Sequence, residues 1–155
     1  MIHLKDINQD NLFKVTALSD TLTDVQKKCV APNIVSIAQA YVNLDRAWPK
    51  AIYNDDELVG FVMLALHDDD IPKEDQPAYF LWRFMIAKPY QSQGFGKQVL
   101  DIIYQKCIDD DVKYLYTSCE MHDEMPYRFY MNYGFIDTHE KDDDEEILKI
   151  RIENK

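Results

Sequence analysis

Residues Tyr79 to Lys97 read YFLWRFMIAKPYQSQGFGK and join a run of bulky apolar residues to a glycine-bearing segment. The aromatic and branched side chains of Tyr79–Ala87 predict a long β-strand. Further along, apolar residues recur at helical spacing and predict a helix to about Ile108; they are Val99, Leu100, Ile103 and Cys107. The segment Gln91–Gly96 is therefore expected to connect a strand to a helix.

The two glycines of this connection indicate a phosphate-binding turn. Gly94 and Gly96 allow the backbone to turn tightly and to approach a ligand closely. Unpaired N–H groups and the positive dipole end at a helix start suit a pyrophosphate, and Lys97 adds a cation in the first turn. The spacing matches neither a Walker A loop nor a dinucleotide-binding fingerprint. Taken alone, the glycines are also explained by a plain strand-to-helix turn.

The rest of the chain predicts strands and helices in a mixed α/β order. Strands are expected at Met1–Ile7, Trp48–Tyr53, Leu58–Leu66, Lys113–Ser118, Phe135–Thr138 and Glu146–Ile152. Helices are expected from Asp10 or Asn11 to Leu18, from Asp20 to Val42 with a break at Pro32, and from Asp123 or Glu124 to Tyr133 before a Gly134 C-cap. We therefore expect an α/β (α+β) mixed-sheet fold, with residues 1–155 as a single domain.

The composition narrows the classes of partner. The chain has 155 residues, is 46% hydrophobic and carries a formal net charge of −11. Such a balance argues against nucleic acid, whose phosphates require clustered Lys and Arg. A negative field would raise the local concentration of a cationic amine. Solubility alone explains the same charge equally well.

Cysteine and histidine predict neither disulfide bonds nor a metal site. Cys29, Cys107 and Cys119 are too few and too scattered for a disulfide framework or a structural zinc site. The four histidines form no HxxxH or HExxH pattern, so no metal is expected. The N-terminal residues contain no apolar signal region, and no run is long enough to cross a membrane. A cytoplasmic protein with no membrane partner is expected.

The segment after the long strand resembles the signature of the GNAT acetyltransferase superfamily, Gln/Arg-x-x-Gly-x-Gly/Ala. Gln91, Gly94 and Gly96 match it residue for residue. The stretch YFLWRFMI and the following Tyr90-Gln91 resemble the spermine/spermidine (diamine) acetyltransferase branch. Many members carry a proline one place before the position of Pro89, but the loop length to Gln91 is kept.

The resemblance implies acetyl-CoA as the co-substrate and places its site. The pantetheine arm would lie beside the long strand, with its amides paired to main-chain groups of Phe84, Met85 and Ile86. The pyrophosphate would lie in the turn formed by Gln91, Ser92, Gln93, Gly94, Phe95, Gly96 and Lys97. Family members are often dimers, so a homodimer is expected.

A second motif, Phe129-Tyr130-Met131-Asn132-Tyr133-Gly134-Phe135, resembles the GNAT pattern Leu-Tyr-x-x-x-Gly-Phe. The register on Gly134 selects Tyr130, which the resemblance implies is the general acid that protonates the leaving thiolate. Packing among the aromatic residues of this helix is the alternative role for Tyr130. Asp123 falls where many members have a cofactor-contacting Asn, and a plain helix N-cap is its alternative role.

The general base is not fixed by the sequence. Glu120 and His122 are candidates for direct or water-relayed removal of the amine's proton. A solvated turn carboxylate is the alternative interpretation of Glu120. Arg83, a cation in the long strand, would repel an amine if it faced the acceptor, but strand alternation equally allows it to face away.

These features favour an N-acetyltransferase that moves the acetyl group of acetyl-CoA to a primary amine by direct attack. The favoured acceptor is a small-molecule polyamine or diamine such as spermine or spermidine. Two alternatives stay open. One is another acceptor on the same scaffold, such as a protein N-terminus or lysine, an amino acid or an aminoglycoside-like drug. The other is a non-enzymatic module that only binds CoA.

Overall fold

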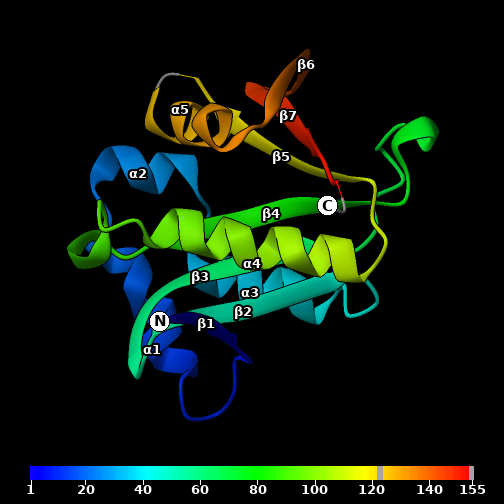
Figure 1. Cartoon of the computed structure of the whole chain (residues 1–155). Coiled ribbons are helices and arrows are strands. Elements are labelled where there is room, and N and C mark those ends of the chain that lie inside the picture. The colour runs from blue at the N-terminus through cyan, green and yellow to red at the C-terminus, as the bar shows by residue number, and fades with distance from the viewer. Residues whose placement is uncertain (122–123, 154–155) are drawn as a thin grey trace.

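A seven-stranded sheet with strand order β1-β2-β3-β4-β5-β7-β6 organises the molecule (Figure 1). The computed structural model describes residues 1–121 and 124–153. Only the β4–β5 pair is parallel; its neighbours pair in antiparallel fashion. The strands are β1 (Ile2–Lys5), β2 (Ala47–Asn54), β3 (Glu57–Ala65), β4 (Ala78–Ile86), β5 (Tyr114–Glu120), β6 (Ile136–Asp142) and β7 (Glu145–Arg151).

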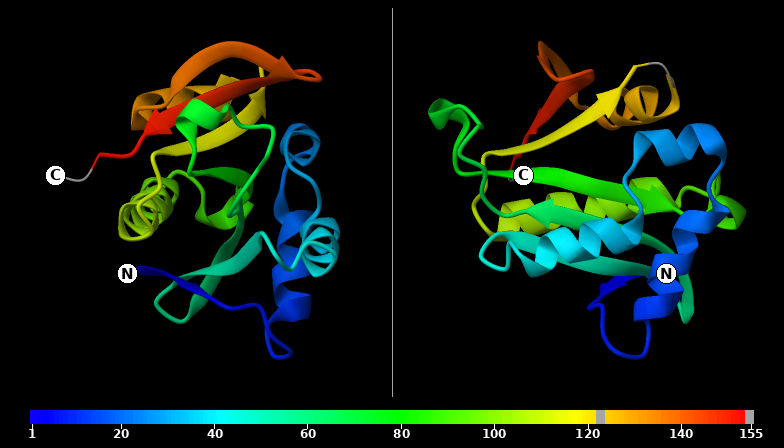
Figure 2. Two further views of the ribbon diagram at one scale, coloured as in Figure 1. Left: turned by 90° about the vertical axis from the view of Figure 1, so that its right-hand side faces the viewer. Right: turned by 180° about the vertical axis from the view of Figure 1, so that it is seen from behind.

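Helices cover both faces of the sheet (Figure 2). The helices α1 (Leu12–Ala17), α2 (Asp24–Cys29) and α3 (Asn33–Tyr41) lie on one side, and α4 (Phe95–Asp109) lies on the other. The helix α5 (Glu124–Tyr133) lies beside β5 and packs into the same apolar core as α4. A second core lies under α1 and α3, where Val15 and Ala40 pack on Phe61, Met63 and Met85.

The feature that matters most for function is a fork between β4 and β5. The two strands pair only through four residues each, Ala78–Leu81 with Tyr114–Thr117. Beyond this point they diverge, and the gap widens toward the end of the sheet near α2 and α5 (Figure 1). At the fork, the Thr117 hydroxyl donates a hydrogen bond of 3.2 Å to the Leu81 carbonyl. On the other edge of β4, the pairing with β3 shifts between Met63 and Leu64, so Trp82 forms a β-bulge.

Local sequence explains the helices that flank the fork. Thr23 and Gln26 form a reciprocal capping box that begins α2. Pro32 separates α2 from α3, because proline has no N–H to continue a helix.

Gly60 on β3 is needed because a Cβ there would lie 2.4 Å from the Met85 carbonyl oxygen.

The loop between β3 and β4 is fastened to the sheet by a buried carboxylate. Asp75 accepts hydrogen bonds from the Tyr116 hydroxyl and, at 2.8 Å, from Lys149 Nζ. Burial alone would raise the pKa of Asp75, but the bonds from Lys149 and Tyr116 outweigh it and hold the pKa below its usual value. Ile71 packs beside it against Ala78 and Tyr116. The loop is thus held over the β5 side of the fork.

The predicted mixed α/β fold is confirmed, and the strands and helices occur in the predicted places. Some ends differ: β5 continues to Glu120, so that residue ends the strand instead of following it. The strand β6 runs to Asp142, because the pairing with β7 resumes after an irregular stretch at residues 138–140. Short 3-10 turns at Leu18–Thr21 and Lys73–Asp75 have no periodic signal that would predict them. In the described part of the chain, no helix has the length and apolar character of a membrane span.

Candidate active site

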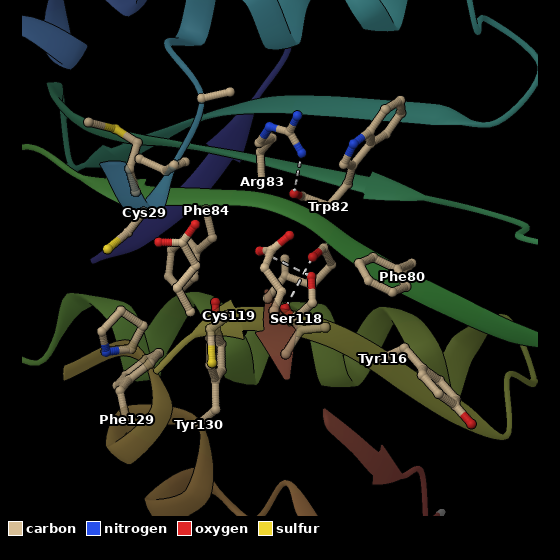
Figure 3. A pocket seen from close by; sticks show the side chains of 18 of the residues that line it. Cys29, Phe80, Trp82, Arg83, Phe84, Tyr116, Ser118, Cys119, Phe129 and Tyr130 are labelled. Atoms are coloured by element: carbon tan, nitrogen blue, oxygen red, sulfur yellow. Dashed lines mark hydrogen bonds between the residues drawn. The ribbon is translucent and has the colours of Figure 1, made fainter. Parts of the chain in front are cut away.

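A cavity of about 1080 Å³ occupies the fork between β4 and β5 (Figure 3). Residues 80–86 of β4 and residues 116–120 of β5 form its two long walls. Its ends are closed by α2, the start of α4, α5, the residue 68–72 loop and the β6–β7 hairpin. Ligand pockets typically measure about 300–1,000 Å³, so the fork has room for an extended ligand together with a small second molecule.

The glycine turn lies at one end of this cavity and is shaped to receive an anion. Ser92 has φ of 64° and Gly94 has φ of 82°, both in the left-handed region. Gly94 is the N-cap residue of α4, and no side chain caps the helix. A Cβ at Gly94 would meet no atom within 4 Å, so the turn faces open space. The first N–H groups of α4 therefore remain available for a bound ligand.

Gly96 also lies against α5. A Cβ at Gly96 would lie 3.0 Å from the Cζ atom of Phe129, so the Phe129 ring would have to shift to admit a larger residue. Phe129 also packs near Phe84, with ring centroids 6.2 Å apart. Gly96 thus shapes the cavity wall through Phe129.

Gln91 fastens the turn to its neighbours. Its Nε2 donates to the Ile86 carbonyl at 2.9 Å, and its Oε1 accepts from Gln26 Nε2 at 2.9 Å. The side chain therefore links the end of β4 to α2. Gln93 Nε2 donates to the Pro89 carbonyl at 3.4 Å, and Lys97 Nζ lies 3.3 Å from an Asp101 carboxylate oxygen.

The free edge of β4 presents main-chain groups to the fork. The Ala87 N–H donates to the Val59 carbonyl at 2.8 Å, which fixes the alternation of this antiparallel pair. Phe84 and Ile86 therefore direct their main-chain groups away from β3, toward the fork. Met85 differs from the expectation, because its carbonyl faces Gly60 on β3.

Tyr130 is placed both to pack among aromatic side chains and to line the cavity. Its ring packs between Phe129 and Phe135, with centroid distances of 5.4 and 5.3 Å. The side chain also lines the cavity and points from α5 toward the space between the strands (Figure 3). Burial raises the pKa of Tyr130, and a hydrogen bond with Thr117 opposes that rise. The hydroxyl is thus protonated at neutral pH and lies at the fork.

Carboxylates lie further along the cavity wall. Glu120, the last residue of β5, lines the cavity and lies opposite Glu145 on β7. The Ser118 hydroxyl donates to Glu145 Oε1 at 3.4 Å. Burial raises the pKa of Glu145, and the negative charge of Glu120 adds to that rise. The sequence interpretation missed Glu145, which lies just before the predicted strand Glu146–Ile152. Glu145 is recognised only in the folded structure, where the pairing of β7 with β5 brings it beside Glu120.

Two predicted site residues, His122 and Asp123, lie outside the described residues. Arg83 lines the cavity, but its guanidinium donates to the Trp82 carbonyl at 2.9 Å and to Gln39 Oε1 on α3 at 3.0 Å. Burial lowers the pKa of Arg83. Within the described residues, no group of His, Cys, Asp and Glu is arranged to hold a metal ion.

Charge is distributed unevenly around the cavity. Lys27 and Lys28 of α2 lie on the same side as Lys97, since Gln26 reaches the turn through Gln91. Acidic residues line the part formed by the residue 68–72 loop, β5 and the β6–β7 hairpin; they are Asp68, Asp70, Glu120, Glu140, Asp142 and Glu145. Arg46, Arg83 and Lys141 are also part of the lining. The lining is thus basic where α2 and the start of α4 contribute to it, and mainly acidic where the residue 68–72 loop, β5 and the β6–β7 hairpin contribute.

A family model described as the Acetyltransferase (GNAT) family matches residues 22–135 of the chain. The chain belongs to this family. The resemblance read from Gln91, Gly94 and Gly96 is thereby confirmed at the level of the family, whose members are transferases that act on acetyl-CoA. The matched residues extend from the start of α2 through the fork to the end of α5.

A curated relative is similar to the chain over a little more than half of its length. The "Probable spermine N(1)-acetyltransferase" of Bacillus subtilis subsp. natto (strain BEST195) is 31% identical over 88 residues. This match spans 56% of the present chain and 58% of the relative.

Solved structures share the whole fold at low sequence identity. An acetyltransferase of Thermus thermophilus has a TM-score of 0.73 and 17% identity, with 97% of each chain covered. The PaiA N-acetyltransferase of Thermoplasma acidophilum, solved with coenzyme A, has a TM-score of 0.68 and 15% identity, with 97% of this chain and 99% of that chain covered. An aminoglycoside acetyltransferase, also solved with coenzyme A, has a TM-score of 0.76 and 12% identity, with 97% and 95% covered. These likenesses show the GNAT fold and not the acceptor.

Proposed function

We propose that the protein transfers the acetyl group of acetyl-CoA to a primary amine of a polyamine or diamine by direct attack. The observation that carries the proposal is the polarity of the cavity in the fork. The proposed phosphate-binding turn and the lysines belong to α2 and the start of α4, whereas carboxylates line the wall formed by β5, the β6–β7 hairpin and the residue 68–72 loop. A polyanionic donor and a polycationic acceptor can thus bind in the same cavity against walls of opposite charge.

The residues at the glycine turn fit coenzyme A. The N–H groups at the start of α4 suit the pyrophosphate, and Lys97, Lys27 and Lys28 lie on the same side of the cavity. The outward main-chain groups of Phe84 and the N–H of Ile86 suit the amides of the pantetheine arm, which then lies along the edge that β5 leaves unpaired, while the Ile86 carbonyl is bound by Gln91. An N–H group of this edge would polarise the thioester carbonyl. Asp123 stays a proposed contact from the sequence alone.

Tyr130 is the proposed general acid. Its hydroxyl lies in the cavity wall at the fork, and its raised pKa keeps the proton available at neutral pH. The proton passes to the sulfur as the carbon–sulfur bond breaks, so the thiolate leaves as a thiol.

Direct attack agrees with the state of the buried thiol in the cavity. Cys119 lines the wall beside Tyr130 (Figure 3), and burial raises the pKa of its thiol to about 12. A thiol that stays protonated at neutral pH is a poor nucleophile. An acetyl-enzyme formed on Cys119 is therefore disfavoured.

The polyamine is favoured among acceptors by the carboxylates in the cavity lining and by the partial match to a probable spermine N(1)-acetyltransferase. Arg83 is compatible with it, because the guanidinium is directed toward Gln39. Related folds act on other acceptors, so a protein amine or an aminoglycoside remains the competing substrate class. A homodimer and a cytoplasmic location remain predictions.

Two measurements test the proposal. Calorimetric titration with acetyl-CoA in the presence of EDTA should show binding without metal, and absence of binding at millimolar ligand would overturn it. A panel of amines, assayed for acetyl-CoA-dependent thiol release, should then rank spermine and spermidine above single-charge amines and aminoglycosides. Binding of acetyl-CoA without thiol release to any amine would favour a CoA-binding module.

A further inference from the structure

Two carboxylates lie side by side where β5 and β7 leave the fork. Glu120 ends β5 and Glu145 begins β7, and the two are direct cross-strand partners. Both side chains line the cavity. Like charges directly opposite each other destabilise an antiparallel pair, so the two carboxylates concentrate negative charge at this point of the cavity wall.

The surroundings of Glu145 come from four elements. On β5 it faces Glu120, Cys119 and the Ser118 hydroxyl, which donates to its Oε1 at 3.4 Å. The remaining groups within electrostatic range are Asp142 at the end of β6, Arg83 on β4 and Tyr130 on α5. Glu145 is half-buried, and it interacts electrostatically with the proposed general acid across the cavity. Glu145 thus lies near both Glu120 and the proposed general acid Tyr130.

We propose that Glu145 holds the acceptor's ammonium group and takes its proton, with Glu120 beside it as a second anionic contact. This inference rests on the proposed amine acetylation. One proton moves from the ammonium nitrogen to the Glu145 carboxylate, and from there to solvent. The freed lone pair forms a bond to the thioester carbon. As the carbon–sulfur bond breaks, sulfur takes the Tyr130 proton, and the second proton lost by the nitrogen restores Tyr130.

Ser118 and Arg83 both shift the pKa of Glu145 in the direction opposite to burial. Burial and the charges of Glu120 and Asp142 raise the pKa of Glu145, while the Ser118 bond and Arg83 lower it. A base whose pKa lies nearer to neutrality accepts a proton from an amine more readily than an ordinary glutamate does. Activity must then fall as the pH drops through this pKa, because the protonated carboxyl cannot accept a second proton.

The test is Glu145→Gln, which keeps the size of the side chain and its acceptor oxygen for Ser118. Turnover should fall by about 10²–10⁴-fold, as for loss of a general base, while calorimetric affinity for acetyl-CoA stays within twofold. The acidic limb of the kcat–pH profile should disappear. The matched control is Glu146→Gln: Glu146 lies opposite Cys119, pairs with Lys141 at 3.3 Å and does not line the cavity, so its variant should keep the wild-type profile.

Glu120→Gln separates the two carboxylates. Removing its charge should lower the pKa of Glu145 and move the acidic limb to lower pH, with a weaker apparent affinity for the amine. If Glu145→Gln keeps its turnover and acidic limb, the assignment of the base is overturned while the acetyltransferase proposal stands. If the acidic limb of the kcat–pH profile shifts with the pKa of the amine substrate and stays unchanged in the Glu120 and Glu145 variants, Glu145 is also excluded as the base. If the wild-type protein acetylates no amine, the proposed function itself has failed.

Discussion

A Cβ at position 96 would lie 3.0 Å from the Cζ atom of Phe129, so a residue larger than glycine would press on the Phe129 ring where the start of α4 meets α5. Phe129 in turn reaches Phe84 on the free edge of β4. Gly96 thereby connects the glycine turn, the helix of Tyr130 and the strand that borders the cavity.

Gly96→Ala should lower the free energy of unfolding by about 1–3 kcal/mol, the usual cost of overpacking. The added methyl group has to displace Phe129. Urea unfolding of Gly96→Ala, Phe129→Leu and the double variant forms a cycle, in which the second change should relieve part of the cost of the first. Strictly additive effects would show that the two residues are not in contact.

Gly94→Asp should abolish acetyl-CoA binding and leave the fold intact. The new side chain meets no protein atom, since nothing lies within 4 Å of its Cβ, but its charge enters the space proposed for the pyrophosphate. Gly94→Asn is the matched control, because Asn tolerates the positive φ without adding charge. Calorimetry should show a much smaller loss of acetyl-CoA affinity for Gly94→Asn than for Gly94→Asp. Equal affinities for the Asp and Asn variants would place the phosphates elsewhere.

Tyr130→Phe should reduce turnover toward the range of about 10²–10⁴-fold that general acid–base catalysis supplies. The low end is expected, since a thiolate is a tolerable leaving group, and the affinity for acetyl-CoA should barely change. Tyr133→Phe is the control: its hydroxyl bonds to Asp101 at 2.8 Å, and it does not line the cavity. Nearly full turnover in Tyr130→Phe, with chemistry rate-limiting, would make Tyr130 a packing residue only.

The apparent affinity for spermine should weaken as salt rises from about 0.01 to 0.15 M, where the Debye length falls from about 30 to 8 Å. The cause is screening of the cavity carboxylates that attract the polycation. KM for spermine should rise more steeply with salt than KM for a monoamine at saturating acetyl-CoA. A flat response for spermine would remove polyamines from first place among the acceptors.

Asp75→Asn should destabilise the protein at pH 7 by about 1–3 kcal/mol, because it leaves the buried partners of a carboxylate poorly paired. The folded-state pKa of Asp75 is lowered, so its contribution is present above the unfolded-state value and is lost as the pH falls below about 4. Urea unfolding at pH 7 and pH 3 should show the gap between wild type and variant closing at the lower pH. A gap that is independent of pH would indicate a purely steric effect.

The sequence predicted the fold and the turn because both depend on local patterns. The long apolar strand, the glycine turn and the periodic helix after it each have a signal within about ten residues. The position of Tyr130 followed from its register with Gly134, where φ is 127° and the amide bonds back to the Tyr130 carbonyl at 3.2 Å.

The remaining features depend on contacts between distant segments. Gln91 meets Gln26 across 65 positions, and Glu120 meets Glu145 through strand pairing. The role of Gly96 is set by Phe129, which no spacing rule links to it. The orientation of Met85 depends on the hydrogen-bond phase between β3 and β4, which the sequence does not encode locally.

The fork also has a consequence for handling the protein. Residues 82–86 of β4 have no strand partner on the β5 side in the described structure, and such edges can pair with a strand from another molecule. Acetyl-CoA bound along this edge would occupy those groups, and a ligand that binds only the folded state also raises its stability by mass action. Purification and storage with the donor present should therefore suppress aggregation more than an equal concentration of free pyrophosphate, which reaches the turn but leaves the edge bare.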